Sequence, residues 1–288
     1  MKILVFGSTG LIGTALEIVS RKKNIQCVGL GHHDVDATDE QAVRKAIIEH
    51  RPTVVINSVV IIGPPCEEDP LKAFQVNTLA AYYMARVCAQ EDILFIQPST
   101  HAVFDGTLDD FYTESDEPRP MNIYSGSKYL AEIFAANLCP KHYIVRFPTM
   151  FGPRRNQKGG FVDKMLARIK SGQELRVVVD KIDSLSYSID IAGQILLMLD
   201  RQVPYGFYHL ANAGKISFYE FIRKMMQLLE VKNNLVPAKA GDFSTQGHQS
   251  LKTAMKSEKL PSLRNWEEAL SEYVSVYLKP GIHEEVKK

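Results

Sequence analysis

Five short apolar runs alternate with longer segments of helical periodicity over the first half of the chain. The runs occupy residues 3–6, 25–30, 53–57, 93–97 and 143–147. Apolar runs of this length are typical of strands that are buried on both faces. The segments between them are too long for hairpins, so consecutive strands are expected to run parallel and to be joined by helices. The pattern therefore predicts an α/β protein with a doubly wound parallel sheet.

A glycine-rich segment, GSTGLIG, follows the first apolar run directly and opens the first helical segment. Gly7, Gly10 and Gly13 recur at intervals of three residues. In a strand–turn–helix setting, the first glycine permits a tight turn, the second lets the backbone approach a diphosphate, and the third allows close helix packing. The segment predicts a Rossmann-type dinucleotide-binding turn at a helix N-terminus, and a purely structural turn is the alternative. The other residues expected to contact the dinucleotide here are Thr9, Leu11 and Ile12.

The alternation becomes looser after residue 147, with helices expected at 159–172, 191–200, 217–229 and around Trp266, and strands at 175–179 and 206–211. No repeat and no low-complexity linker separates this part from the first, which argues against an independent second domain. We expect residues 1–150 to form the dinucleotide-binding domain, with residues 180–213 returning to it. Residues 151–179 and 214–288 then form a smaller substrate-binding lobe that is interleaved with the sheet.

The residues after the second strand, GLGHHDVDATD, bear on which dinucleotide is bound. Many NAD sites carry a carboxylate at the end of this strand, which holds the ribose 2′-hydroxyl. Here His32 and His33 occupy that region, so no carboxylate is expected there to repel a 2′-phosphate, and the histidines, His32 in particular, could donate hydrogen bonds to one. We therefore expect NADP(H), with NAD(H) as the alternative cofactor. Plain exposed loop histidines would fit the sequence equally well.

Two residues beyond the histidines, Asp36 and Ala37, are expected near the adenine. Asp36 could accept a hydrogen bond from the adenine amino group, and an ordinary turn aspartate is the alternative. Thr38 and Gln41 have the spacing of a capping box, which predicts a helix over 40–50 with Thr38 as its N-cap.

Hydroxyl groups and one ammonium group are expected to meet at the carboxyl edge of the sheet. Ser99 and Thr100 follow the fourth strand, where the crevice of such sheets binds ligands. Tyr124 and Lys128 are spaced by four residues on the next helix and project from one face of it. The ammonium would favour the phenolate and lower the pKa of Tyr124, which would speed proton exchange with a carbonyl oxygen. Thr100 could bond the same oxygen, and a hydroxyl that caps its own backbone is the alternative.

Several segments together resemble the extended short-chain dehydrogenases/reductases, and within them the dTDP-4-dehydrorhamnose reductase family, which completes dTDP-L-rhamnose synthesis. The matching segments are GSTGLIG, DVDATD, RPTVVINS, FQVNTLAAYYMA, STHAVFDG, PMNIYSGSK and YIVRFPTMFG. Their set and order are more specific than any single motif. The resemblance implies that Thr100, Tyr124 and Lys128 form a catalytic trio and that Lys128 also holds the nicotinamide ribose. The further cofactor contacts that the resemblance implies are Asp36, Asn57, Ser58, Val59 and Val60. Asn77 matches an asparagine on a helix of the family, and a residue on a polar helix face is the alternative for it.

Departures from this family lie at the substrate end. The family usually has Ser-Thr-Asp-Tyr where this chain has Ser-Thr-His-Ala, which places His101 beside Thr100, and a tryptophan where this chain has Thr149. It also commonly has Tyr-Thr after the third strand, where two isoleucines stand here, and an Arg-Pro pair in the tail that this chain lacks. Arg154 and Arg155 are available for a substrate diphosphate, with solvated loop charge as the alternative. The expected substrate-binding residues are Thr100, His101, Thr149 and Arg154.

The motifs and the resemblance lead to one expected function. Hydride would pass from the nicotinamide to the keto carbon of a nucleotide-linked 4-keto-6-deoxy sugar, with Tyr124 as proton donor, Thr100 holding the oxygen and Lys128 poising the tyrosine. An epimerase or dehydratase of sugar nucleotides on the same fold is one alternative. A catalytically silent regulatory subunit, resembling the beta subunit of methionine adenosyltransferase, is the other.

Composition limits the partners. The formal net charge is +1 without a basic block, so nucleic acid is not an expected partner. The four cysteines are far apart and lack metal-ligand spacing, so we expect reduced thiols in a cytoplasmic protein and no metal site. No apolar stretch reaches the length of about 18 residues that a membrane helix needs. The expected partner is a small-molecule nucleotide sugar, and a homodimer is left open.

Overall fold

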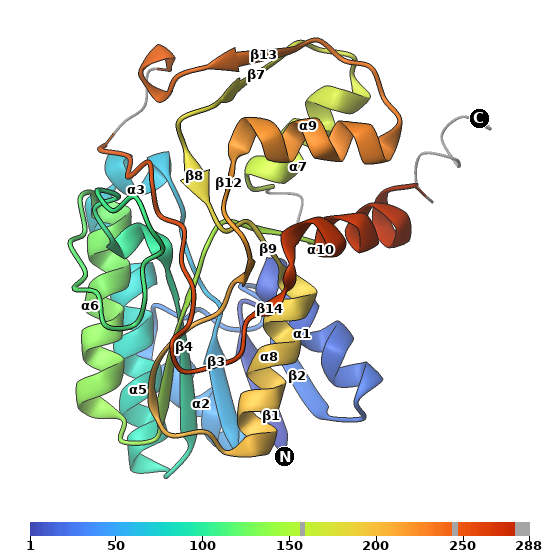
Figure 1. Ribbon diagram of the computed structural model, residues 1–288. Coiled ribbons are helices and arrows are strands. Elements are labelled where there is room, and N and C mark those ends of the chain that lie inside the picture. The colour runs from blue at the N-terminus through green and yellow to red at the C-terminus, as the bar shows by residue number, and fades with distance from the viewer. Residues whose placement is uncertain (156–158, 244–246, 280–288) are drawn as a thin grey trace.

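The computed structural model describes residues 1–155, 159–243 and 247–279. Its centre is a sheet of six parallel strands in the order β10-β5-β4-β3-β1-β2 (Figure 1). The strands are β1 (Lys2–Phe6), β2 (Gln26–Leu30), β3 (Val54–Asn57), β4 (Leu94–Thr100), β5 (His142–Phe147) and β10 (Gly206–His209). The predicted α/β class with a doubly wound parallel sheet is confirmed.

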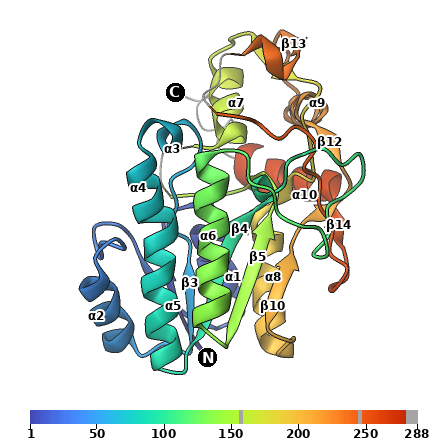
Figure 2. The same cartoon turned by 90° about the vertical axis from the view of Figure 1, so that its left-hand side faces the viewer.

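Helices cover both faces of this sheet (Figures 1 and 2). One face carries α1 (Leu11–Lys22) and α8 (Ser188–Arg201), and the other carries α2 (Glu40–His50), α5 (Ala80–Gln90) and α6 (Ile123–Leu138). Successive residues of β1 serve the two faces, because Ile3 and Val5 join the core with α1 and α8 whereas Leu4 and Phe6 join the core with α2 and α5. Burial of both faces explains why β1 is a continuous apolar run in the sequence. None of the described helices is long and apolar enough to cross a membrane.

A long helical stretch leads from the end of β3 towards β4, but a π-helical turn interrupts it. Helix α4 (Pro70–Phe74) continues through this turn (Gln75–Leu79) into α5. A short helix, α3 (Pro64–Glu68), precedes α4 and was not predicted. Single π-helical turns inside helices are frequent at functional sites, and this one contains Asn77.

The second half of the chain forms a smaller lobe beyond the carboxyl ends of the strands (Figure 1). Its helices are α7 (Phe161–Lys170), α9 (Phe218–Leu229) and α10 (Trp266–Tyr273), and a π-helical turn (Val274–Leu278) continues α10. Two-stranded ladders pair β6 (Met150–Phe151) with β9 (Ser186–Tyr187), β7 (Leu175–Val178) with β13 (Leu235–Ala238), β8 (Ile182–Asp183) with β12 (Ile216–Ser217), and β11 (Asn212–Ala213) with β14 (Leu263–Asn265). Short 3₁₀ turns occur at His101–Val103 and Ala240–Asp242. The lobe has its own apolar cluster, to which Phe221, Trp266 and Tyr273 contribute.

The chain passes between sheet and lobe more than once. After β6 and α7, helix α8 packs against α1, and β10 then pairs in parallel with β5 at the edge of the sheet. The chain leaves the sheet again through α9 and α10. This path fits the division that we propose, in which residues 1–150 and 180–213 form one unit and residues 151–179 and 214–288 form the lobe. Within 180–213, however, β8 and β11 pair with strands of the lobe, and Leu185 and Tyr187 pack in its apolar cluster.

The start of α2 differs from the predicted capping box. The N-cap residue is Asp39, whose Oδ1 accepts hydrogen bonds from the N–H groups of Gln41 at 2.8 Å and Ala42 at 3.2 Å. Thr38 instead donates its hydroxyl hydrogen bond to Oδ1 of Asp36 at 2.7 Å. The prediction of Thr38 as N-cap is therefore wrong, because aspartate is the stronger N-cap and stands one residue nearer to the helix.

Candidate active site

The turn between β1 and α1 requires glycine at two of its three predicted positions. Gly7 has a φ of +78°, and a Cβ atom there would lie 2.6 Å from the carbonyl carbon of Ser58. A Cβ atom at Gly13 would lie 2.6 Å from the Cα atom of Ser8, so this glycine lets α1 approach the turn. A Cβ atom at Gly10 would meet only one atom, a backbone oxygen at 3.4 Å. The turn therefore packs tightly toward the protein and stays open at Gly10.

The N-terminus of α1 offers hydrogen-bond donors that an anion can use. Its N-cap residue, Gly10, has no side chain to cap the helix, and the first N–H groups of a helix lack intrahelical acceptors. The hydroxyl of Ser58, beside this turn, is buried and has no hydrogen-bond partner among the described residues. Thr9 is exposed and Leu11 is half-buried, whereas Ile12 packs in the core. These open donors and the helix dipole fit the diphosphate of a dinucleotide.

A carboxylate stands at the end of β2, where the sequence led us to expect none. Oδ2 of Asp34 accepts a hydrogen bond from the N–H group of Gly31 at 2.7 Å. The expectation is wrong because the turn after β2 folds back and returns Asp34 to the end of the strand. His32 and His33 are exposed, and their ring centroids are 3.6 Å apart. Both histidines and one carboxylate thus follow the end of β2, the region in which the adenine ribose is expected.

Asp36 is already engaged within its own turn. Its Oδ1 accepts hydrogen bonds from the hydroxyl of Thr38 at 2.7 Å and from the N–H group of Thr38 at 2.8 Å. The hydroxyl and then the N–H group lower the pKa of Asp36. The turn role is therefore present, and the adenine contact stays a prediction, as does the contact of Ala37, which is buried beside α2.

Two buried amide side chains fix the loop that follows β3. Asn57 is fully buried, and its Nδ2 donates to Oε1 of Gln97 on β4 at 2.9 Å. Asn77 is also fully buried, and it donates to the carbonyl of Ile61 at 3.0 Å while accepting from the N–H group of Ile61 at 2.8 Å. A polar helix face is thus excluded for Asn77, which attaches the loop to the π-helical turn. The cofactor contacts proposed from Asn57 through Val60 depend on this fixed loop.

Thr100 and Tyr124 meet at the carboxyl end of β4, which is longer than predicted and has Thr100 as its last residue. The two side chains lie near each other, because the hydroxyl of Thr100 acts on the ionisation of Tyr124 and lowers its pKa. Thr100 Oγ1 also accepts from the N–H group of Ala102 at 3.1 Å, so backbone capping is present as well. Lys128, one turn further along α6, is 3% exposed and donates from Nζ to the carbonyl of Pro98 at 2.7 Å. The predicted trio therefore lies around one strand end.

The start of α6 is fixed from two directions. Asn122 and Ser125 form a reciprocal capping box, with Oδ1 of Asn122 accepting from the N–H group of Ser125 at 2.8 Å. Glu67 of α3 accepts from the N–H groups of Tyr124 at 3.2 Å and Ile123 at 3.3 Å. A carboxylate at this end also interacts favourably with the helix dipole. The position of Tyr124 is therefore set by its own helix and by the segment after β3.

The pKa values of the trio differ from the expectation. Burial raises the pKa of Tyr124 to about 12, reinforced by Cys66 and opposed by the hydrogen bond from Thr100. Burial also lowers the pKa of Lys128 to about 8, and the charge of Glu132 opposes this shift. The expected lowering of the Tyr124 pKa is therefore wrong for the protein without ligands. The reason is that desolvation of the phenolate outweighs a lysine whose ammonium points at a backbone carbonyl.

The sequence matches one family over nearly all of its length. Residues 1–279 match the family model described as the RmlD substrate binding domain. The chain belongs to this family. The predicted resemblance to dTDP-4-dehydrorhamnose reductases is thereby confirmed.

Individual relatives of the RmlD substrate binding domain family cover nearly the whole chain. The spore coat polysaccharide biosynthesis protein SpsK of Bacillus subtilis is 27% identical over 278 residues, which are 95% of this chain and 96% of that protein. The solved dTDP-4-dehydrorhamnose reductase of Clostridium acetobutylicum has a TM-score of 0.90 and 29% identity, and the match covers 96% of this chain and 99% of that one. The dTDP-4-dehydrorhamnose reductase of Bacillus anthracis, solved in complex with NADP, has a TM-score of 0.89 and 25% identity over 96% and 99% of the two chains.

At the substrate end, this member of the RmlD family brings His101 and Thr149 together. Nδ1 of His101 lies 3.2 Å from the carbonyl oxygen of Phe147, and Nε2 lies 3.7 Å from Oδ2 of Asp183. The same Asp183 oxygen accepts from the N–H group of Thr149 at 2.9 Å. Burial lowers the pKa of His101, while Asp183 raises it and Lys181 lowers it. The fully buried Asp183 of β8 carries no motif, and the sequence did not predict it.

The two arginines of the FGPRRNQ segment, Arg154 and Arg155, form ion pairs with different helices. Arg154 forms an ion pair with Asp163 of α7 at 3.0 Å. Arg155 forms an ion pair with Glu17 of α1 at 2.6 Å, and its N–H group donates to the carbonyl of Thr9 at 3.3 Å. Arg155 therefore lies beside the glycine turn, and Arg154 is the one that we retain as a substrate contact.

A buried ion pair next to the trio was not predicted. Glu132 of α6 and Arg146 of β5 are 0% and 3% exposed, and they make two contacts, at 3.0 Å and 2.7 Å. Two signals in the sequence could have indicated it. Glu132 follows Lys128 by one helical turn, and Arg146 interrupts the apolar run YIVRF, where a buried charge requires a partner.

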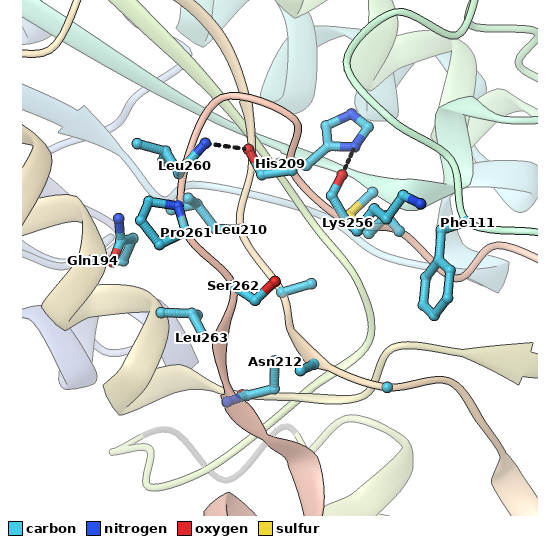
Figure 3. Close-up of a pocket in the computed structure, with 15 residues that line it drawn as sticks. Phe111, Gln194, His209, Leu210, Asn212, Lys256, Leu260, Pro261, Ser262 and Leu263 are labelled. Carbon is cyan, nitrogen blue, oxygen red and sulfur yellow. Dashed lines mark hydrogen bonds between the residues drawn. The ribbon is translucent and has the colours of Figure 1, made fainter.

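A pocket of about 220 Å³ lies beyond the end of β10 (Figure 3). Its lining includes Gln194 of α8, His209 of β10, and Lys256, Leu260 and Ser262 of the C-terminal segment. The ring of His209 faces the carbonyl of Lys256 at 3.2 Å in this view. None of the predicted catalytic, cofactor or substrate residues lines this pocket, so it is not the candidate site for the chemistry.

Proposed function

We propose that the chain is an NAD(P)H-dependent reductase of a nucleotide-linked 4-keto-6-deoxy sugar, similar to dTDP-4-dehydrorhamnose reductase. The observation that carries the proposal is the meeting of Thr100 and Tyr124 at the carboxyl edge of the sheet, where the hydroxyl of Thr100 acts on the phenol. The glycine turn after β1 opens onto the same edge, because all six strands run parallel. Membership of a family whose relatives are named as reductases supports it.

NADP(H) is the proposed cofactor, with NAD(H) as the alternative. The NADP in the related Bacillus anthracis structure supports this choice. The N–H groups of the first turn of α1, which begins at Leu11, would hold the diphosphate, and the free hydroxyl of Ser58 would donate to the cofactor. Lys128 would hold the nicotinamide ribose. When bound, the reduced nicotinamide supplies the hydride.

The side chains themselves would supply binding and a proton. Tyr124 would give its phenolic proton to the carbonyl oxygen of the sugar as negative charge develops there. Thr100 would donate a hydrogen bond to the same oxygen. The ammonium of Lys128, whose pKa lies near 8, is charged at neutral pH and would stabilise the phenolate that remains after the transfer.

The substrate would lie between the strand ends and the lobe. His101 and Thr149, which share Asp183, would face the sugar beside Thr100. Arg154 would bind the diphosphate of the nucleotide, since a guanidinium can bond two phosphate oxygens at once.

The reductase activity predicts that NADPH is consumed in equal amount to the sugar. The measurement is the loss of reduced-nicotinamide absorbance with 4-keto-6-deoxy sugars linked to dTDP, UDP and GDP. We expect turnover with at least one of the three. Bound NAD that co-purifies with the protein and is not consumed would instead indicate an epimerase or a dehydratase. Absence of turnover with all three sugar nucleotides, together with a stable protein partner, would indicate a regulatory subunit.

Asp34 is expected to reduce the preference of the enzyme for NADPH. Its carboxylate lies at the end of β2, where many NAD sites carry the acid that binds the ribose 2′-hydroxyl, and there it would repel a 2′-phosphate. Two unit charges about 4 Å apart in water interact by about 1 kcal/mol. The Asp34→Asn variant should therefore raise the ratio of kcat/KM for NADPH over NADH by about fivefold.

The matched control for this measurement is Asp39→Asn. This variant changes the net charge equally, and asparagine still caps α2. The ratio should not change in the control. An unchanged ratio in Asp34→Asn would show that this carboxylate does not face the 2′ position.

A further inference from the structure

One face of α6 carries three functional groups in succession, from Tyr124, Lys128 and Glu132. Their spacing places each side chain one turn beyond the last. Tyr124 and Lys128 belong to the proposed trio, whereas neither the motifs nor the proposed mechanism uses Glu132. A glutamate that is 0% exposed requires an explanation, because an isolated buried carboxylate is strongly unfavourable.

The carboxylate of Glu132 is bound at both oxygens. Arg146 donates from Nε to Oε1 at 3.0 Å and from Nη2 to Oε2 at 2.7 Å, and Ser99 also donates to Oε1. Ser99 and Arg146 stand opposite each other in the ladder between β4 and β5. Ser99 directly precedes Thr100. Glu132 therefore ties the helix of Tyr124 to the strand end of Thr100.

Arg146 is itself enclosed, so the pair cannot easily rearrange. Its guanidinium carbon lies 5.3 Å from the ring centroids of both Phe104 and Phe207. Its Nη1 is 3.5 Å from Nε2 of His209, whose Nδ1 faces two backbone carbonyl oxygens. Carbonyl oxygens only accept hydrogen bonds, so Nδ1 carries the proton and Nε2 turns its lone pair toward Arg146. Burial lowers the pKa of His209 to about 4, so this histidine is neutral at pH 7.

The negative charge of Glu132 favours the charged form of Lys128. Burial disfavours the ammonium of Lys128, and Glu132 is the charge that opposes this effect. The other titratable groups near the trio and its helix are Arg146 of β5, His209 of β10, Cys66 and Glu67 of α3, and Tyr124 of α6. Cys66 and Tyr124 are neutral at pH 7, because burial raises their pKa values to about 11 and about 12. Glu67 is bound to N–H groups in the first turn of α6.

We propose that Glu132 is a positioning residue: anchored by Arg146 and Ser99, it keeps Lys128 charged at the strand end that carries Thr100. The inference rests on the proposed roles of Tyr124 and Lys128 in the reductase reaction. A buried ion pair adds little to stability compared with apolar side chains of similar volume. If the ion pair of Glu132 and Arg146 were purely structural, removing the charge of Glu132 would leave the titration of Lys128 unchanged. The titration of Lys128 therefore distinguishes a positioning role of Glu132 from a structural one.

The test is a direct titration of Lys128 in the cofactor-free protein. Lysine labelled with ¹³C at Cε reports the ionisation by NMR, and the Lys128→Met variant assigns the resonance. The wild-type midpoint is expected near pH 8. In Glu132→Gln it should fall by about one unit or more, because a nearby opposite charge typically shifts a pKa by about 1–3 units. In Glu132→Asp, which keeps the charge, it should stay within about half a unit of the wild type.

Glu114→Gln is the matched control. Glu114 accepts hydrogen bonds from the N–H group of His209 at 2.8 Å and from Ser257, so its removal also disturbs the polar network around Arg146. It does not act on the ionisation of Lys128. The midpoint of Lys128 should therefore remain at the wild-type value in this variant.

The same shift should appear in catalysis. The alkaline limb of kcat/KM against pH, measured with NADPH and whichever of the three keto-sugar nucleotides is turned over, should move to lower pH in Glu132→Gln and return in Glu132→Asp. If Glu132→Gln does not fold, the double variant Glu132→Gln/Arg146→Gln, which leaves neither charge unpaired, should shift the NMR midpoint in the same direction. An unchanged midpoint in a folded variant would overturn the inference even if activity falls. Wild-type turnover in Tyr124→Phe would overturn the proposed function instead, so the two failures are distinguishable.

Discussion

Tyr124→Phe is expected to lower kcat by about two to four orders of magnitude, the usual range for the loss of a general acid. The substitution removes the hydroxyl that would deliver the proton and keeps the aromatic ring. Thr100 keeps its hydrogen bond from the N–H group of Ala102. Affinity for NADPH should stay within about threefold of the wild type, because the phosphate turn is untouched. Steady-state kinetics and fluorescence titration with NADPH measure the two quantities.

Tyr129→Phe is the matched control for this experiment. It removes the same hydroxyl from a half-buried tyrosine on the same helix, outside the trio. Its turnover should be that of the wild type. Since burial holds the pKa of Tyr124 near 12, the wild-type phenol is protonated across the usual assay range and should add no limb to the pH profile below about pH 10. A kcat in Tyr124→Phe within tenfold of the wild type would rule out this tyrosine as the proton donor.

Arg146→Met is expected to lower the free energy of unfolding by about 3–5 kcal/mol, the cost of removing one partner from a buried ion pair. The carboxylate of Glu132 would remain fully buried and would lose both of its contacts to the guanidinium. Methionine fills a similar apolar volume between Phe104 and Phe207, so the loss of packing is kept small. Urea unfolding at neutral pH measures the difference.

Arg21→Met provides the comparison on the surface. Arg21 pairs with Glu17 at 3.2 Å, but its side chain is 78% exposed, so this variant should change the free energy of unfolding by less than about 1 kcal/mol. The double variant Arg146→Met/Glu132→Leu should recover part of the stability, because neither charge is then left buried alone. Equal effects of Arg146→Met and Arg21→Met would contradict the buried pair as an anchor.

Local patterns were enough to predict the sheet and most helices. The helix over 40–50 begins and ends where its periodicity placed it, although its N-cap lies one residue later than expected. The six-stranded sheet follows from apolar runs separated by helices. The two-residue strands of the lobe could not be predicted in this way. Strands such as β8 and β11 exist only through partners far along the chain, and two residues show no periodicity.

The features of the candidate site also differ in how far local sequence patterns could predict them. Thr100 and Tyr124 could be brought together from sequence, because parallel strands end at one edge and the next helix starts there. The pKa of Tyr124 could not be predicted from the sequence, since burial depends on everything that packs around the phenol. Asp34 was missed because a tight turn returns it to the strand end. The partner of Glu132 depends on the register between β4 and β5, which no local pattern specifies.

Since α8 and β10 follow the first part of the lobe in the chain, no single cut separates lobe from sheet. A hybrid that joined a foreign C-terminal segment after residue 150 would strip α8 from the apolar face of Ile3 and Val5 and leave β5 as a bare edge. Evolution by fusion or recombination at that boundary is therefore obstructed. In such an architecture, a new specificity is more easily reached by substitution at the strand ends, where we propose that His101 and Thr149 face the sugar.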